Sequence, residues 1–172
     1  MLVIPAGQRS MASPAYVIRN PEQVVNKFTI TEEEQAADTL ELWHQEKISE
    51  LKAFLKGYDM TSISTDELKE VGSRLFESGA INSRAFRMFI EGSGASDSKG
   101  RQTDTHVKFN AIALFNERLE DEIDFFEKNP RIARGDGAAD YLQGMVRANH
   151  VINALAYFVN SSRNEISIDE SA

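Results

Sequence analysis

Hydrophobic residues between Ala138 and Asn160 recur every three or four positions, a spacing typical of one face of an α-helix. From Val151 to Val159 the apolar residues spread around the whole helix, and Asn153 is the one polar residue among them. A helix that is apolar on every side has to be covered by neighbouring elements. The pattern therefore predicts a central helix over 138–160. Its main buried face is expected to hold Tyr141, Leu142, Met145, Ile152, Leu155 and Val159.

Two further long helices are predicted from the same periodicity. Thr31 with Glu34 forms a capping box, a pairing that marks a helix start, and Gly57 marks the end, so one helix is expected over 31–56. Its buried face would comprise Ala36, Leu40, Trp43, the stem of Lys47, Ile48, Leu51, Phe54 and Leu55. The other is expected over 105–128, before Asn129-Pro130, and buried along Phe109, Ile112, Phe115, Leu119, Ile123 and Phe126.

A helical hairpin is predicted between these long helices. Ser64 and Glu67 form a second capping box, and Gly79 suits the end of the helix that follows. A shorter helix over 83–91 would complete the hairpin. Pro21 after Asn20 indicates a short helix over 21–28. Residues 92–104 hold no apolar side chain larger than alanine, which predicts a mobile loop.

These elements predict an all-α fold, an antiparallel helical bundle of three long helices plus a short helical hairpin, with no significant sheet. We expect a flexible N-terminal segment over 1–19, a single helical domain over 20–160 and an acidic C-terminal tail over 161–172. Met1 and Met11 are both possible natural starts.

Composition limits the possible functions. The chain has 172 residues, no cysteine and a formal net charge of −8. Without cysteine it cannot use thiolate catalysis, disulfides or zinc–thiolate sites. The negative charge disfavours a nucleic-acid partner, whose phosphates attract Lys and Arg. No secretory signal or membrane span is evident, so a cytoplasmic protein without a cofactor is expected.

One pattern favours a metal site. Glu41 and His44 have the Glu-x-x-His spacing that di-metal carboxylate sites use in helical bundles. Such a site needs a second copy of the motif, and neither His106 nor His150 supplies one. A metal- or small-ligand-binding helical-bundle enzyme that uses Glu41 and His44, with His150 as a further candidate, is therefore an alternative function.

The hairpin carries two other interpretations. The hairpin resembles the short helix–Gly-x-Ile–helix unit of small bacterial interaction modules. The residues that carry this resemblance are Leu68, Leu75, Phe76, residues 77–81 and Phe86. The same geometry would suit a helix-turn-helix DNA-binding regulator, with Arg84 and Arg87 on its second helix. Because acidic residues outnumber basic ones in this segment, DNA binding is the second alternative.

The principal hypothesis is a non-enzymatic, cytoplasmic protein-binding module, an adaptor or chaperone-like protein that also forms a homodimer. Its small size, acidity and helicity are similar to those of bacterial secretion chaperones and adaptors. Several large apolar residues give these helices more apolar surface than short helices usually bury. Apolar surface that stays exposed marks an interaction site. The predicted partner-binding residues are Phe86, Met88, Phe89, Ile90, Tyr157 and Phe158.

Overall fold

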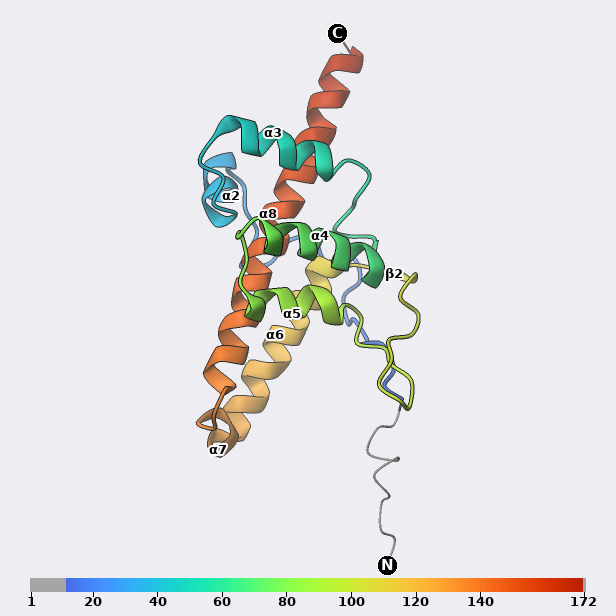
Figure 1. The fold of residues 1–172 in the computed structure, drawn as a ribbon, viewed down its shortest axis with the longest axis vertical. Helices are drawn as coiled ribbons and strands as arrows, with labels where there is room; N and C mark the ends of the chain where they lie inside the picture. The colour runs from blue at the N-terminus through green and yellow to red at the C-terminus, as the bar shows by residue number, and fades with distance from the viewer. Residues whose placement is uncertain (1–11, 172) are drawn as a thin grey trace, which may run out of the picture.

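The computed structural model describes the backbone of residues 12–171 and the side chains of residues 12–161. Helix α8 (Ala138–Ser171) runs through the length of the molecule, and the other elements lie along it (Figure 1). The remaining helices are α2 (Glu33–Thr39), α3 (Gln45–Phe54), α4 (Thr65–Glu77), α5 (Ser83–Glu91), α6 (Ala111–Lys128) and α7 (Pro130–Ala133). Strands β1 (Ile63–Ser64) and β2 (Lys108–Phe109) form one small antiparallel pair. The protein is mostly helical, as predicted.

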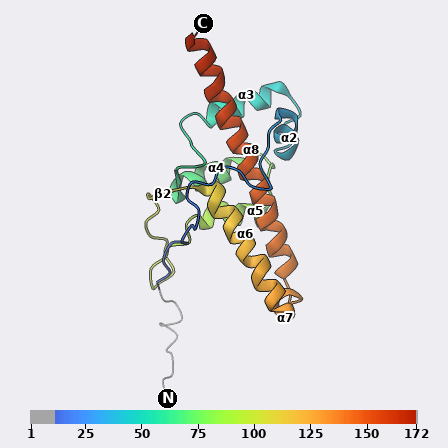
Figure 2. The ribbon, with the colours of Figure 1, turned by 180° about the vertical axis from the view of Figure 1, so that it is seen from behind.

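The central helix is confirmed. Helices α2, α5 and α6 pack against α8 from different sides (Figures 1 and 2). Within 151–159, only Ala156 and Tyr157 are partly exposed, and the other residues are buried. The helix also continues past Asn160, where the sequence predicted a tail, to Ser171. The question of Met1 or Met11 as the natural start lies outside the described residues.

The predicted long helix over 31–56 is wrong, because the chain forms two helices there. Helix α2 ends at Thr39, and Glu41 adopts a left-handed conformation with φ of 57°. The N–H group of Leu42 donates to the carbonyl oxygen of Ala37, which closes the end of α2. Trp43 lies in the resulting turn and is 68% exposed, although the sequence predicted it to be buried. The bundle of three long helices is therefore reduced to α6 and α8, with short helices packed around them.

Residues 12–30, which we name the strap, contain no helix. The short helix predicted over 21–28 is replaced by turns, because side chains there bond to the local backbone. The Asn26 side chain accepts from the N–H of Phe28 at 2.8 Å, and the Thr29 hydroxyl accepts from the N–H of Asn26 at 2.8 Å. Helix α6 likewise begins later than predicted, since Asn110 caps it and residues 108–109 form β2.

The α4–α5 hairpin forms as predicted. The Ser64 side chain accepts from the N–H of Glu67 at 3.2 Å, and the Glu67 carboxylate accepts from the N–H of Ser64 at 3.1 Å. Residues 92–104, predicted as a mobile loop, form a defined turn. The carboxylate of Asp97 accepts from the N–H groups of Lys99 and Arg101, both at 2.9 Å, and closes this turn.

Gly144 allows α5 and α8 to approach closely, so its replacement tests their packing. A methyl group at this position would lie 2.8 Å from the carbonyl oxygen of Arg84, and the helices would have to move apart. We expect Gly144→Ala to lower the free energy of unfolding by about 1–3 kcal/mol, although alanine ordinarily favours a helix over glycine by ~1 kcal/mol. Urea denaturation measures the change, with Ser49→Ala, at an exposed position of α3, as the control. A variant as stable as the wild type would contradict this packing.

Candidate functional site

A cleft of about 590 Å³ opens beside the end of the buried segment of α8. The strap, the loop between α3 and α4, the start of α6 and the last buried turns of α8 each contribute to its wall. We name it the α8 cleft. It is lined by Val24, Thr29, Ile30, Asp59, Met60, Thr61, Ile112, Asn153, Ala156, Tyr157, Val159, Asn160 and Ser161.

The polar group placed deepest in the cleft is the Asn153 side chain, since the residue is only 4% exposed. Its Nδ2 donates to the backbone carbonyl of Asn149 at 2.8 Å. The side chain of Asn149 is itself held, because its Nδ2 donates to the carbonyl of Phe115 at 2.9 Å. Among the described residues, no donor reaches Oδ1 of Asn153. This oxygen is therefore the group that Asn153 can offer to a bound molecule.

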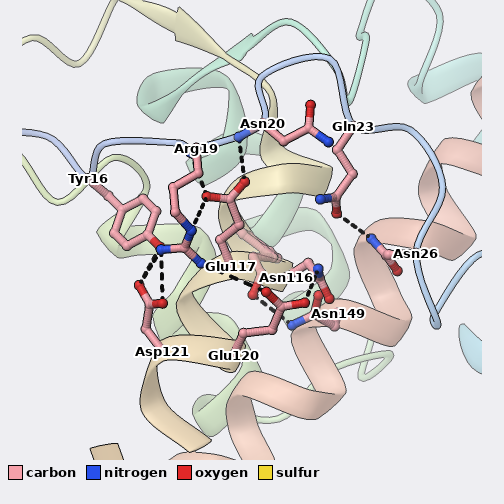
Figure 3. Close-up of polar contacts among 11 residues, drawn as sticks. Tyr16, Arg19, Asn20, Gln23, Asn26, Asn116, Glu117, Glu120, Asp121 and Asn149 are labelled. Carbon is pink, nitrogen blue, oxygen red and sulfur yellow. Dashed lines mark hydrogen bonds and ion pairs between the residues drawn. The ribbon is translucent and has the colours of Figure 1, made fainter. Parts of the chain in front are cut away.

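The strap wall of the cleft is anchored to α6 by a buried carboxylate. Glu117 is 2% exposed and accepts from the backbone N–H groups of Arg19 at 2.6 Å and Asn20 at 3.0 Å (Figure 3). Asn110 extends this anchor, since its Nδ2 donates to the carbonyl oxygens of Pro21 at 2.9 Å and Gln23 at 2.6 Å. These bonds fix the chain just before Val24 enters the cleft.

A second anchor lies at the start of the strap. The Tyr16 hydroxyl donates to Asp121 at 2.5 Å, and Arg19 forms an ion pair with Asp121 at 3.0 Å (Figure 3). Burial and this hydrogen bond raise the pKa of Tyr16 to about 12. Burial works to raise the pKa of Asp121, but the hydrogen bonds from Arg19 and Tyr16 outweigh it and leave that pKa below its ordinary value.

The predicted partner-binding residues do not form one surface. Met88, Phe89 and Phe158 are core residues, so their assignment to a binding surface is wrong. Phe86 and Ile90 are partly buried. The ring of Phe86 stacks on the exposed ring of Phe76, with 4.6 Å between the two ring centroids. Of the predicted set, Tyr157 lines the α8 cleft.

The remaining cleft residues were missed because they come from segments far apart in the sequence. Val24, Ile30 and Met60 gave no periodic pattern of their own. Asn153 could have been found, since it interrupts an otherwise apolar segment that has to be buried.

The alternative metal site at Glu41 and His44 does not have the geometry that the spacing suggested. Glu41 lies in the turn after α2 and His44 precedes the first residue of α3, so they share no helix face, and both are exposed. The described part of the chain holds no group of three His, Asp or Glu residues placed to bind a metal ion. His150 lies edge-on to Phe28, and partial burial together with Arg147 lowers its pKa.

The arginines considered for DNA binding are paired with carboxylates. Arg84 contacts Asp140 at 3.1 Å, and Arg87 contacts Glu91 at 3.5 Å. These ion pairs reduce the positive charge that the hairpin could present to a phosphate backbone.

Comparisons with known proteins do not add a function. The chain matches no protein-family model, and no curated protein or solved structure is significantly similar to it. Over the described residues, no helix is long and apolar enough to cross a membrane.

Replacing Glu117 with Gln tests the anchor of the strap. The amide has one acceptor oxygen for two backbone N–H donors, and its own NH₂ group would face one of them. We expect a loss of about 1–3 kcal/mol in unfolding free energy and faster hydrogen exchange at Arg19 and Asn20. Glu127→Gln, at an exposed position of the same helix, is the control. Unchanged exchange in Glu117→Gln would show that the carboxylate does not hold the strap.

The tyrosines provide a test by titration. The pKa of Tyr58 is also raised to about 12, by its hydrogen bond to Glu70 and by burial. Absorbance at alkaline pH should show two late-titrating phenols, of which Tyr16→Phe and Tyr58→Phe each remove one. Because the pKa of Tyr16 in the folded protein exceeds the ordinary 10.0, its contribution to stability is present below pH 10 and lost as the pH rises toward 12. Ordinary titration of Tyr16 would contradict its bond to Asp121.

Proposed function

We propose that the protein is a non-enzymatic, cytoplasmic protein-binding module, adaptor or chaperone-like, and that the α8 cleft is its partner site. The observation that carries the proposal is the partial exposure of Ala156 and Tyr157 within an otherwise buried helix segment. Covering this flank would bury more apolar surface, which is the usual source of association free energy. The cytoplasmic location remains a prediction from the sequence.

The dimensions and chemistry of the cleft support binding. Its volume of about 590 Å³ lies within the range typical of ligand sites, roughly 300–1,000 Å³. Apolar side chains such as Ile30, Met60 and Val159 make up much of its wall, with a few polar groups between them.

Catalysis has less support than binding. Acid–base catalysis usually employs titratable groups with shifted pKa values inside the site. The raised pKa values of Tyr16 and Tyr58 and the lowered pKa of Asp97 belong to residues outside the cleft wall. Each of these residues is hydrogen-bonded to a charged partner or held in a turn, which accounts for the shift without catalysis.

We also propose self-association through a second surface, the α8 stripe. Its residues recur every three or four positions along α8 and leave a shallow, mainly apolar groove. Two copies could pack the same stripe against each other about a two-fold axis, the commonest symmetry of soluble oligomers. The stripe consists of Ala139, Leu142, Gln143, Val146, Arg147 and His150.

Panning a displayed library of linear peptides against the protein tests the partner site. We expect enriched peptides whose binding weakens at least about tenfold, or ~1.4 kcal/mol, in Ala156→Trp, because the indole would fill the cleft. Ala53→Trp, at an exposed position of α3, is the matched control and should bind normally. If no enriched peptide distinguishes the two variants, the cleft is not the partner site.

Sedimentation equilibrium tests self-association. The wild type should be a dimer, and Val146→Glu should be a monomer because a charge would be buried in the α8 stripe. Val17→Glu, which changes a valine that is already well exposed in the strap, should remain dimeric. A monomeric wild type at all concentrations, or a dimeric Val146→Glu, would contradict this part of the proposal.

A further inference from the structure

We propose that the α8 cleft binds an extended peptide segment, neutral or basic in charge, that inserts an apolar side chain and donates a backbone N–H to Oδ1 of Asn153. This inference rests on the proposed partner site and specifies its ligand. It depends on three features: the fixed orientation of Asn153, the spacing of Asn153 and Tyr157, and the charge of the lining.

The Asn153 side chain is held in place before any ligand binds. Its Nδ2 is committed to Asn149 in the preceding turn, and Asn149 is committed to α6 through Phe115. The Oδ1 atom is therefore positioned without a partner from the described residues. Because no described donor bonds this oxygen, it can accept a hydrogen bond from a ligand that fills the cleft. The cleft thus selects for ligands that carry an N–H or O–H group beside an apolar side chain.

A peptide backbone supplies such donors only where it is not helical. Inside a helix, the N–H groups already bond to carbonyls four residues earlier. An extended chain presents free N–H and C=O groups, and those on one side repeat at roughly 6.5 Å. Asn153 and Tyr157 lie one helical turn apart, roughly 6 Å along α8. Among the described residues the Tyr157 hydroxyl has no hydrogen-bond partner, so it can donate to a peptide carbonyl while Asn153 accepts.

The charge of the lining favours a neutral or basic peptide. None of the described residues that line the cleft is Lys, Arg or His. The whole chain carries a net charge of −8. An acidic ligand would therefore be repelled as it approached, and no described lining residue carries a positive charge that could pair with it.

An ester scan of the tightest-binding linear peptide from the panning tests the N–H donor. Each ester replaces one backbone N–H with oxygen and changes the shape of the peptide little. One ester should weaken binding to the wild type about tenfold and binding to Asn153→Leu by less than about twofold, because the leucine has no acceptor to lose. Asn153→Asp, which keeps an acceptor oxygen, should retain the preference for the amide. If Asn153→Leu fails to fold, Asn153→Ala, which also lacks the acceptor, provides the same comparison.

The outcomes separate this inference from the function on which it rests. If binding is sensitive to Ala156→Trp but no ester effect depends on Asn153, the partner site stands and the proposed recognition is wrong. A bound peptide that is helical by NMR, or acidic variants that bind as tightly as basic ones, would also overturn it. If no peptide is sensitive to Ala156→Trp, the proposed function itself fails.

Discussion

The burial of the apolar segment of α8 is the constraint on which the rest of the structure depends. Three helices pack on α8, and the apolar surface that they bury stabilises the fold by roughly 25 cal/mol per Å². Arg147 reinforces the arrangement, because its Nη2 donates to the carbonyl of Thr39 at 2.6 Å and to that of Ala80 at 3.0 Å. One side chain thus ties α2 and the turn between α4 and α5 to the central helix. The flank at Ala156 and Tyr157 remains, and the cleft forms there.

Several buried polar side chains lie at the contact between α6 and α8, where apolar side chains alone would suffice for packing. Asn116 and Asn149 lie side by side between these helices (Figure 3), and Oδ1 of each is buried without a partner among the described residues. Each such oxygen costs about 1–3 kcal/mol. Together with Asn153 and Glu117 they form a polar interior beside the cleft and the strap. Proteins break the rules of core packing mainly at functional sites, which accords with a site here.

Local signals were sufficient for part of the fold. Helix α4 was predictable because the Ser64 capping box needs only neighbouring residues, and α8 because its apolar segment has to be covered. The break after Thr39 was not predictable from periodicity, since Leu40 and Ile48 are both buried and keep the same spacing across the turn. The strap was misread because a Pro after an Asn marks turns as well as helix starts.

The candidate site was less predictable than the fold. Phe89 and Phe158 were assigned to a surface because sequence alone does not show which aromatic rings the other helices cover. Tyr157 was found because it lies at the end of the central helix. The strap and the loop at Asp59 reach the cleft only through tertiary packing, and no local pattern encodes that.

Native-state hydrogen exchange along α8 tests the central claim most directly. If the apolar segment is the covered centre of the fold, the amides of Val151 to Val159 should exchange only through global unfolding, with a free energy equal to that from denaturation. They should be the slowest in the protein. Exchange of this segment through local opening, with a free energy well below the global value, would contradict the account.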